Sequence, residues 1–169
     1  MAQTFTGYFP GVAFAATKNM AGILNSHATE VLKIRRVGCL NPQTGAVSGI
    51  ACIIEWRNYA SGSPGLTAPT AITPTKHDST NTLPTTYTIG HAGTIAGTAE
   101  TLRRTMWSSD EPGASLATMD EFECFVPLNI IFDAGYGDSN VQPHTLRQTQ
   151  MALLYSVAGN AGLLDTWIE

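Results

Sequence analysis

Apolar and polar residues alternate with a period of two along much of the chain, as in β-strands whose side chains point to opposite faces. The segment 49–59, GIACIIEWRNY, shows the pattern clearly. Its Ile54 and Trp56 share one face, and its Glu55 and Arg57 share the other. Similar short runs recur, and residues typical of turns separate them, which predicts many short strands.

The expected strands, taken in chain order, are 31–40, 49–59, 70–77, 85–90, 93–107, 121–132, 151–158 and 163–169. NPQTGAVS (41–48) has the composition of a hairpin turn, and so has GNAG (159–162). Pro74 has no backbone N–H to donate, which places its strand at a sheet edge. The segment 18–28 is expected to form a helical turn or two at most. The pattern favours an all-β fold, an antiparallel β-sandwich of jelly-roll type. Core candidates in 93–107 are Leu102, Met106 and Trp107.

The first 24 residues follow neither the period of a strand nor that of a helix, because Gly7, Pro10 and Gly11 interrupt them. We expect 1–24 to form an extended N-terminal arm and 25–169 to form the β-sandwich domain. Exposed aromatics on a free tail favour aggregation, so a neighbouring subunit is expected to cover them. The candidate interface residues are Phe5, Tyr8, Phe9 and Phe14. The alternative is that the sandwich of the same chain covers them.

Charged residues make up 13% of the chain, against about 25% in a typical domain. Protein interfaces are depleted in charge at their centres, so this composition indicates a surface partly covered in an assembly. The net charge of -4 and the absence of a basic stripe argue against nucleic acid as a partner. No apolar run reaches the roughly 18 residues that a membrane helix needs.

The cysteines are odd in number and form no C-x-x-C pair, which argues against a disulfide framework and fits a reducing compartment. They are Cys39, Cys52 and Cys124. If 31–40 and 49–59 form a hairpin, Cys39 and Cys52 lie nearly opposite each other. We interpret them as two buried thiols.

The segment 132–150, FDAGYGDSNVQPHTLRQTQ, has the composition of a working site, with Asp133, Asp138, His144 and Arg147 close together. Calcium loops of the EF-hand type need oxygen ligands at alternate positions and a closing glutamate, and this segment has neither. We interpret it as an ordered loop in which the aspartates cap backbone N–H groups. A cation held by Asp133 and Asp138 stays open as an alternative.

Other candidate chemistry is weaker. An acidic group could supply the carboxylate pair of a glycosidase, although spacing alone cannot establish their separation. Its members are Asp110, Glu111, Asp120, Glu121 and Glu123. The four histidines never approach the spacing of a zinc motif. The sequence therefore assigns no catalytic residue, no cofactor and no metal ligand. Core packing is the default interpretation of the three tryptophans, Trp56, Trp107 and Trp167.

Several linked phrases distributed over residues 30–169 carry a family resemblance. They are EVLKIRRVGCLNPQTGAVSGI, ITPTKHDSTN, WSSDEP, FVPLNIIFDAGYGDSNVQPHTLRQ and GLLDTWIE. In these phrases the chain resembles the small virion structural proteins of tailed bacteriophages, named head decoration, cement or minor virion proteins. No catalytic signature is part of this resemblance.

The resemblance implies a non-enzymatic protein, made in the bacterial host cytoplasm and located in the virion. It implies a homotrimer that binds the major capsid protein or other virion proteins. The alternative function is that of a tail- or neck-associated β-sandwich module that binds carbohydrate or a receptor. An exposed aromatic platform would favour this alternative, and buried tryptophans would oppose it. A hydrolase that uses the acidic group is a third, weaker hypothesis.

Overall fold

The computed structural model describes residues 3–40, 50–60, 64–83, 85–109, 129–134, 142–157 and 162–169. At positions 50–52, 106–109 and 129 it describes the backbone alone. Within these ranges the regular secondary structure consists of β-strands alone, and all strand pairs are antiparallel. The prediction of an all-β antiparallel fold is confirmed.

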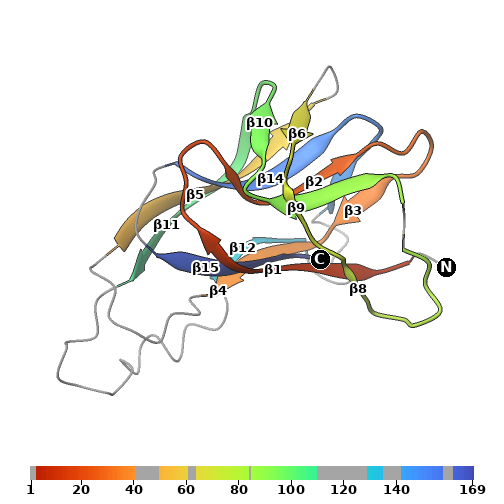
Figure 1. The fold of residues 1–169 in the computed structure, drawn as a ribbon, viewed down its shortest axis with the longest axis horizontal. Coiled ribbons are helices and arrows are strands. Elements are labelled where there is room, and N and C mark those ends of the chain that lie inside the picture. Colours follow the sequence, from red (N-terminus) through yellow and green to blue (C-terminus); the bar gives the residue numbers. More distant parts are fainter. Residues whose placement is uncertain are drawn as a thin grey trace.

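Two large sheets form the body of the molecule (Figure 1). The five-stranded sheet runs in the order β12 (Asn129–Asp133), β4 (Arg36–Leu40), β15 (Leu163–Ile168), β1 (Phe5–Ala13) and β8 (Thr75–Lys76). The six-stranded sheet runs in the order β11 (Glu100–Ser109), β5 (Ile50–Tyr59), β14 (Met151–Ser156), β2 (Asn19–Asn25), β9 (Tyr87–His91) and β7 (Thr70–Ala71). Two small ribbons pair β10 (Thr94–Ala96) with β6 (Gly65–Thr67), and β13 (His144–Leu146) with β3 (Leu32–Ile34).

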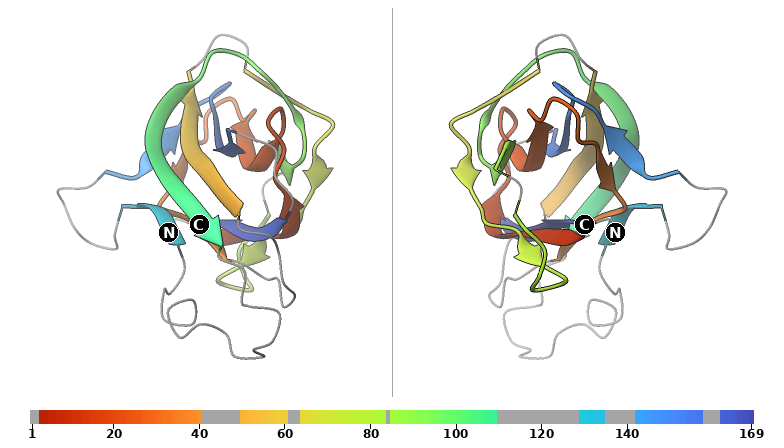
Figure 2. Two further views of the ribbon diagram at one scale, coloured as in Figure 1. Left: turned by 90° about the vertical axis from the view of Figure 1, so that its left-hand side faces the viewer. Right: turned by 90° about the vertical axis from the view of Figure 1, so that its right-hand side faces the viewer.

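Strands that follow each other in the chain occupy matching positions in the two large sheets. The pairs are β12 and β11, β4 and β5, β15 and β14, β1 and β2, and β8 and β9. At each of these connections the chain crosses from one sheet to the other, so the sheets lie face to face (Figures 1 and 2). Neighbouring strands within a sheet are therefore distant in sequence, and both sheets must form together.

The main hydrophobic core fills the space between the sheets. Its largest fully buried side chains include Trp56, Phe9, Ile54, Leu154 and Leu164. The Trp56 ring of β5 stacks on Phe132 of β12, with ring centroids 6.5 Å apart and an interplanar angle of 26°. This contact joins the two sheets directly, and burial of each such side chain contributes roughly 1.5–3 kcal/mol.

A second, smaller core lies on the outer face of the six-stranded sheet. Leu66 of β6 and the partly buried Ile95 of β10 pack there against Tyr59, Met151 and Leu153. The β6–β10 ribbon thus covers part of this face, and Figure 1 shows it above β14 and β2. The chain uses its own insertion between β5 and β11 to bury these side chains.

Strand β2 begins and ends at a buried asparagine. Asn19 Nδ2 donates to the Gly90 carbonyl at 2.7 Å, and its Oδ1 accepts from Gly93 N–H at 2.8 Å. These bonds hold the turn between β9 and β10, where Ala92 has a φ of 56°. A left-handed conformation costs free energy in a residue other than glycine, so the side-chain bonds of Asn19 help to maintain it.

Both predicted hairpins are wrong. The strand expected at 31–40 divides into β3 and β4, and β4 pairs with β12 and β15 rather than with β5. Likewise β14 and β15 belong to different sheets. Cys39 is buried in the five-stranded sheet, whereas Cys52 lies on a strand of the six-stranded sheet. Crossing between the sheets lets each pair of strands bury apolar faces against each other, which a flat hairpin would leave exposed.

The predicted N-terminal arm is also wrong. Residues 5–13 form β1, which pairs with β15 on one side and β8 on the other. The segment expected as a helical turn contains β2, inside the six-stranded sheet. A register shift between Phe9 and Val12 accommodates Pro10 and Gly11, so residues that appear to break regular structure lie in a β-bulge.

Two other predictions concern residues of edge strands, one about the place of a proline and one about a core leucine. Pro74 separates β7 from β8, and these short strands are the last strands of their sheets, so the edge prediction is confirmed. Leu102 was expected in the core, but it is 43% exposed. The pairing of β11 with β5 shifts register between Thr101 and Arg103, and this bulge interrupts the alternation on which the expectation rested. The side chains of Met106 and Trp107 lie outside the described part.

A chain that starts at Gly22 is expected not to fold. It lacks β1, the beginning of β2 and the fully buried Phe9 and Met20. Loss of each such side chain costs about 2–5 kcal/mol, and the pairing of β1 with β15 and β8 is lost as well, so the total is comparable to the roughly 5–15 kcal/mol stability of an ordinary domain. Circular dichroism and a urea titration, with the full chain as control, check this. A cooperative transition with an unchanged midpoint would contradict the placement of β1.

Candidate functional site

The outer face of the five-stranded sheet exposes a group of large apolar side chains. Tyr8 of β1 is the cross-strand partner of Trp167 of β15, and Trp167 is the partner of Gly38 of β4. Leu40 and Ile130 extend the group over β4 and β12. Tyr8, Leu40 and Ile130 are 47%, 46% and 47% exposed, and Trp167 is partly buried. We call Tyr8, Leu40, Ile130 and Trp167 the apolar outer face.

Period-two alternation produces this face. On β4 the side chains of Val37 and Cys39 point into the core, and Leu40 points outward. On β15 Leu164, Thr166 and Ile168 are buried, and Trp167 between them lies on the other side. The five-stranded sheet therefore carries large apolar side chains on its outer face as well as on its inner face, whereas an antiparallel sheet with one solvated face usually carries polar residues there.

Gly38 allows the Trp167 indole to lie against the sheet. A Cβ atom at Gly38 would come 2.1 Å from Cζ2 of Trp167 and 2.5 Å from its Cη2. Glycine inside a strand costs roughly 0.5–1 kcal/mol relative to alanine. An aromatic ring that covers the bare backbone offsets this cost. The result is a flat ring surface at the middle of the face.

Asp165 lies next to Trp167 on the outer side of β15 and is nevertheless 8% exposed. Its Oδ1 accepts from Gly11 N–H at 2.7 Å, and its Oδ2 accepts from the Tyr8 hydroxyl. The hydrogen bond to Asp165, together with burial, raises the pKa of Tyr8. These bonds orient the Tyr8 ring, and each carboxylate oxygen of Asp165 accepts one of them.

The predicted interface residues do not lie together. Phe9 and Phe14 are buried in the core of their own chain, Phe5 is partly buried, and Tyr8 is exposed. Alternation along β1 separates Phe9 from Tyr8, because adjacent residues point to opposite faces. Of the four, Tyr8 contributes a largely exposed ring to the apolar outer face. Sequence analysis missed its neighbours Leu40 and Ile130, because the pairing of distant strands brings them together.

The residues of the segment 132–150 also separate. Asp133 forms an ion pair with Arg36 of β4, with Oδ1 3.2 Å from Nε, and Asp138 lies outside the described residues. His144 packs edge-on against Trp56, whose Nε1–H donates to its Nδ1 at 3.1 Å. Its Nε2 lies 3.0 Å from Asn58 Oδ1, so the neutral ring with its proton on Nε2 satisfies both contacts. Burial lowers the pKa of His144 to about 4.

A buried carboxylate on the outer face of the six-stranded sheet was not predicted as a site. Glu55 is 1% exposed, and each of its oxygens accepts from one arginine. Arg104 Nε lies 2.7 Å from Oε1, and Arg57 Nε lies 2.7 Å from Oε2. Burial opposes ionisation, but the hydrogen bonds and charges of the two arginines outweigh it and lower the pKa of Glu55. Arg57 also lies 3.7 Å above the centre of the Tyr155 ring, which fixes the cluster on the sheet.

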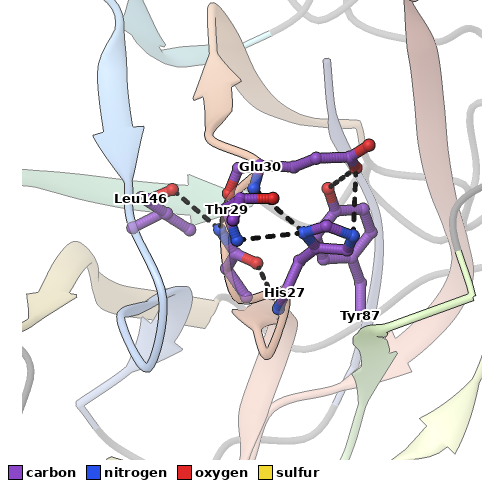
Figure 3. A network of polar contacts seen from close by, with 6 residues as sticks. His27, Thr29, Glu30, Tyr87 and Leu146 are labelled. Atoms are coloured by element: carbon purple, nitrogen blue, oxygen red, sulfur yellow. Dashed lines mark hydrogen bonds and ion pairs between the residues drawn. The ribbon is translucent and has the colours of Figure 1, made fainter.

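A polar network at one end of the sandwich organises the loop between β2 and β3 (Figure 3). The Asn25 side chain donates to the carbonyls of Glu30 and Leu146 at 3.0 and 2.9 Å, and accepts from His27 N–H. His27 Nδ1 accepts from the backbone N–H groups of Thr29 and Glu30. These contacts satisfy backbone groups within the loop, so the network is a structural device.

Tyr87 extends this network, because its hydroxyl donates to Glu30 Oε2 at 3.1 Å. Burial, followed by this bond to the carboxylate, raises the pKa of Tyr87 to about 12. The contact ties the loop to β9, on the far side of β2 from β14. The loop therefore has partners on two neighbouring strands of the six-stranded sheet, β2 and β9.

The remaining predicted sites give little chemistry. The acidic group at 110–123 lies outside the described residues. Where the structure describes the chain, no three His, Cys, Asp or Glu side chains are grouped to hold a metal ion. The same ranges contain no helix that is long and apolar enough to cross a membrane. Trp56 is in the core as predicted, whereas Trp167 lies on the outer face.

Comparison with models of known protein families, with curated proteins and with solved structures finds no match for this chain. Function is therefore argued from the residues themselves.

Stability is expected to fall between pH 6.5 and 4 because of His144. Its pKa is about 4 in the folded chain and near 6.5 when exposed, so the unfolded chain binds the proton first as the pH drops. The stabilisation is complete above pH 6.5 and decreases by at most about 1.4 kcal/mol per pH unit below it. Burial also lowers the pKa of His91, which adds a loss of the same sign.

Urea titrations at pH 7 and 4.5 check this with His144→Gln, which removes the titrating ring. The variant should lose less stability between these pH values than the unmodified chain. His77→Gln, at an exposed histidine that bonds to Thr6, is the control and should behave as the unmodified chain. Equal losses in all three proteins would contradict the assignment to His144.

Glu55→Gln is expected to destabilise the fold by about 1–3 kcal/mol. It keeps the shape of the side chain but leaves the partly buried Arg57 without its carboxylate. Water reaches Arg104, whose side chain is 64% exposed, and this moderates the loss. Glu100→Gln on β11 is the matched control, because Glu100 is exposed and contacts Asn58 at 3.3 Å. Equal urea midpoints for the two variants would show that the cluster does not stabilise the sheet.

Proposed function

We propose that the chain is a non-enzymatic structural protein of a tailed bacteriophage particle, which binds the capsid lattice as a decoration or cement protein. The sequence resemblance over residues 30–169 supports the class of protein. The apolar outer face is the observation that carries the proposal, because large exposed apolar groups mark surfaces that bind other proteins. The low charge of the chain points the same way.

We also propose that the sandwich is a jelly roll, a fold common in viral capsid proteins. The order of strands supports this. Along the chain β1, β4, β12 and β15 belong to one sheet, and β2, β5, β11 and β14 belong to the other. For each strand of the first set, a strand that precedes or follows it in the chain lies at the matching position in the second set. On this basis the segment between β5 and β11 is an insertion that adds β7, β8 and β9 at the edges of the sheets.

The proposed mechanism is mass action. A protein that binds the assembled lattice and not its separate subunits stabilises the lattice by about 2.7 kcal/mol per site, at a hundredfold excess over Kd. A homotrimer, as the resemblance implies, would contact the lattice at several points and add avidity. Its partners would be the major capsid protein or other virion proteins, and its location the virion.

The alternative is a tail- or neck-associated module that binds carbohydrate or a receptor. The flat Trp167 ring beside the exposed Tyr8 favours it, because sugars stack on aromatic rings. Sugar hydroxyls also need polar partners beside the ring. On this face both Asp165 oxygens already accept hydrogen bonds, and Leu40 and Ile130 are apolar. The geometry therefore suits a protein surface better than a sugar.

The proposal predicts that the protein is a stoichiometric part of purified particles. An epitope-tagged copy should sediment with intact particles in a density gradient, and gold-labelled antibody should mark the head surface. Label at the tail tip, with binding to host polysaccharide, would favour the alternative. A protein that stays at the top of the gradient while a coat protein of the same particles sediments normally would contradict both.

A further inference from the structure

The β6–β10 ribbon and the strand pair β7–β9 are two parts of one antiparallel ladder. Thr67 pairs with Thr94 in the ribbon, and Thr70 pairs with His91 at the edge of the six-stranded sheet. Both strands advance by three residues between these pairs, so the register is the same on the two sides of the break. Figure 1 shows the ribbon leaving the layer of the sheet at this break, at the end of β9. We call the residues of the break the hinge, and they are Ala68, Pro69, Ala92 and Gly93.

The hinge is strained on both strands. Ala68 has a φ of 48° and Ala92 has a φ of 56°, in the left-handed region that residues with a Cβ atom disfavour. A ladder that ran straight through the break would return both alanines to the extended conformation of a strand. The strain therefore favours a straight ladder over the bent one that the structure shows.

Pro69 is compatible with a straight ladder. Along two antiparallel strands, every second pair of opposite residues exchanges N–H···O bonds, and the pairs between them do not. Ile72 N–H donates to the Ile89 carbonyl at 3.3 Å, which makes Ile72 and Ile89 a bonded pair. In the shared register Pro69 would face Ala92, three pairs further along and hence at a pair that needs no N–H.

Burial of apolar side chains holds the ribbon in the bent position. Leu66 is 7% exposed and packs, with the partly buried Ile95, against outward side chains of β5 and β14. These side chains are Tyr59, Met151 and Leu153. A straight ladder would carry Leu66 and Ile95 away from them, because it would continue β7 and β9 at the edge of the sheet. Burial and strain thus act in opposite directions at the hinge.

Hydrogen bonds from the start of β2 also hold the bent position. The backbone carbonyl of Asn19 accepts from Ala92 N–H at 2.8 Å, and its Oδ1 accepts from Gly93 N–H at 2.8 Å. In a straight ladder Gly93 would form a bonded pair with Ala68, whose carbonyl would replace Oδ1 as the acceptor. Because Gly93 N–H has a partner in either position, straightening the ladder leaves this donor satisfied.

We propose that the β6–β10 ribbon is a strap with two positions, which opens at the hinge while both large sheets stay folded. In the bent position, which the structure shows, the ribbon covers Tyr59, Met151 and Leu153. In the straight position the ladder runs through the hinge without a break, and these side chains meet solvent. The ribbon therefore sets whether this part of the outer face of the six-stranded sheet is apolar. The device goes beyond the role in a phage particle and does not depend on it.

Thiol labelling of the full chain in native buffer tests this. Leu153→Cys introduces a thiol beneath the ribbon, at a side chain that is fully buried. Cys39 is the control within the same molecule, because it is buried in the main core and becomes accessible when that core opens. N-ethylmaleimide is used at concentrations to which the rate is proportional, and mass spectrometry of the peptides gives the rate at each cysteine. The introduced thiol should react about tenfold or more faster than Cys39, and low urea should leave its rate unchanged, because local opening exposes little surface.

Variants in this background connect the labelling to the hinge. Ala68→Gly removes strain from the bent position and should slow labelling beneath the ribbon roughly threefold. Ala96→Gly is the matched control, because Ala96 is also exposed but lies in the regular part of β10, and this change should not slow labelling. Leu66→Ala removes burial from the bent position and should accelerate labelling about tenfold or more.

Circular dichroism and urea midpoints establish that each variant is folded, and Met151→Cys replaces Leu153→Cys if that variant is not. Equal labelling rates at the introduced thiol and at Cys39 would overturn the proposal, because the ribbon would then open only together with the core. Equal effects of Ala68→Gly and Ala96→Gly would also overturn it, because the opening would then not use the hinge.

Discussion

The stacking of Trp56 on Phe132 is the contact on which the rest of the sandwich depends. Trp56 belongs to the six-stranded sheet and is fully buried, and Phe132 belongs to an edge strand of the five-stranded sheet. His144 of the small β13–β3 ribbon packs edge-on against both rings and accepts the indole N–H. One buried indole therefore links both sheets and a ribbon. Burial in this packing lowers the pKa of His144 to about 4, so the ring is neutral at pH 7 and can accept the indole N–H of Trp56. Acid sensitivity therefore follows from the packing.

The two outer faces show how the same alternation leads to different surfaces. On β5 the outward positions carry Glu55 and Arg57, and a charged network forms there. On β4 and β15 the outward positions include Gly38, Leu40 and Trp167, and the surface there is mainly apolar, with Asp165 hydrogen-bonded to Tyr8 and Gly11. Alternation sets which side chains point outward, but the identity of those side chains decides whether a face is solvated, covered by the chain or suited to another protein.

Much of the secondary structure could be predicted from the sequence, because short β-branched runs with period two are a local signal. The segments 49–59, 85–90 and 163–169 are strands within a few residues of their predicted ends. The pairing of strands could not be predicted in the same way. Turn composition at 41–48 and 159–162 indicates that the chain reverses, but not whether the next strand lies beside the last or across the sandwich. Hairpins were inferred where the chain crosses between sheets.

The apolar outer face was predictable only in part, because the pairing of strands that are distant in sequence brings its residues together. Tyr8 was predicted as a candidate interface residue on an extended arm, but β1 is a sheet strand, and the Tyr8 ring lies on the apolar outer face. Leu40, Ile130 and Trp167 lie far apart in sequence, and nothing local indicates that they share a face. One signal was present in the phrase RRVGCL, where a glycine interrupts an otherwise regular strand. Glycine in that position costs stability unless another group approaches the backbone closely, and here the group is the ring of Trp167. An interior glycine in a predicted strand is thus a reason to look for an aromatic residue elsewhere in the chain, and with it for the neighbouring strand.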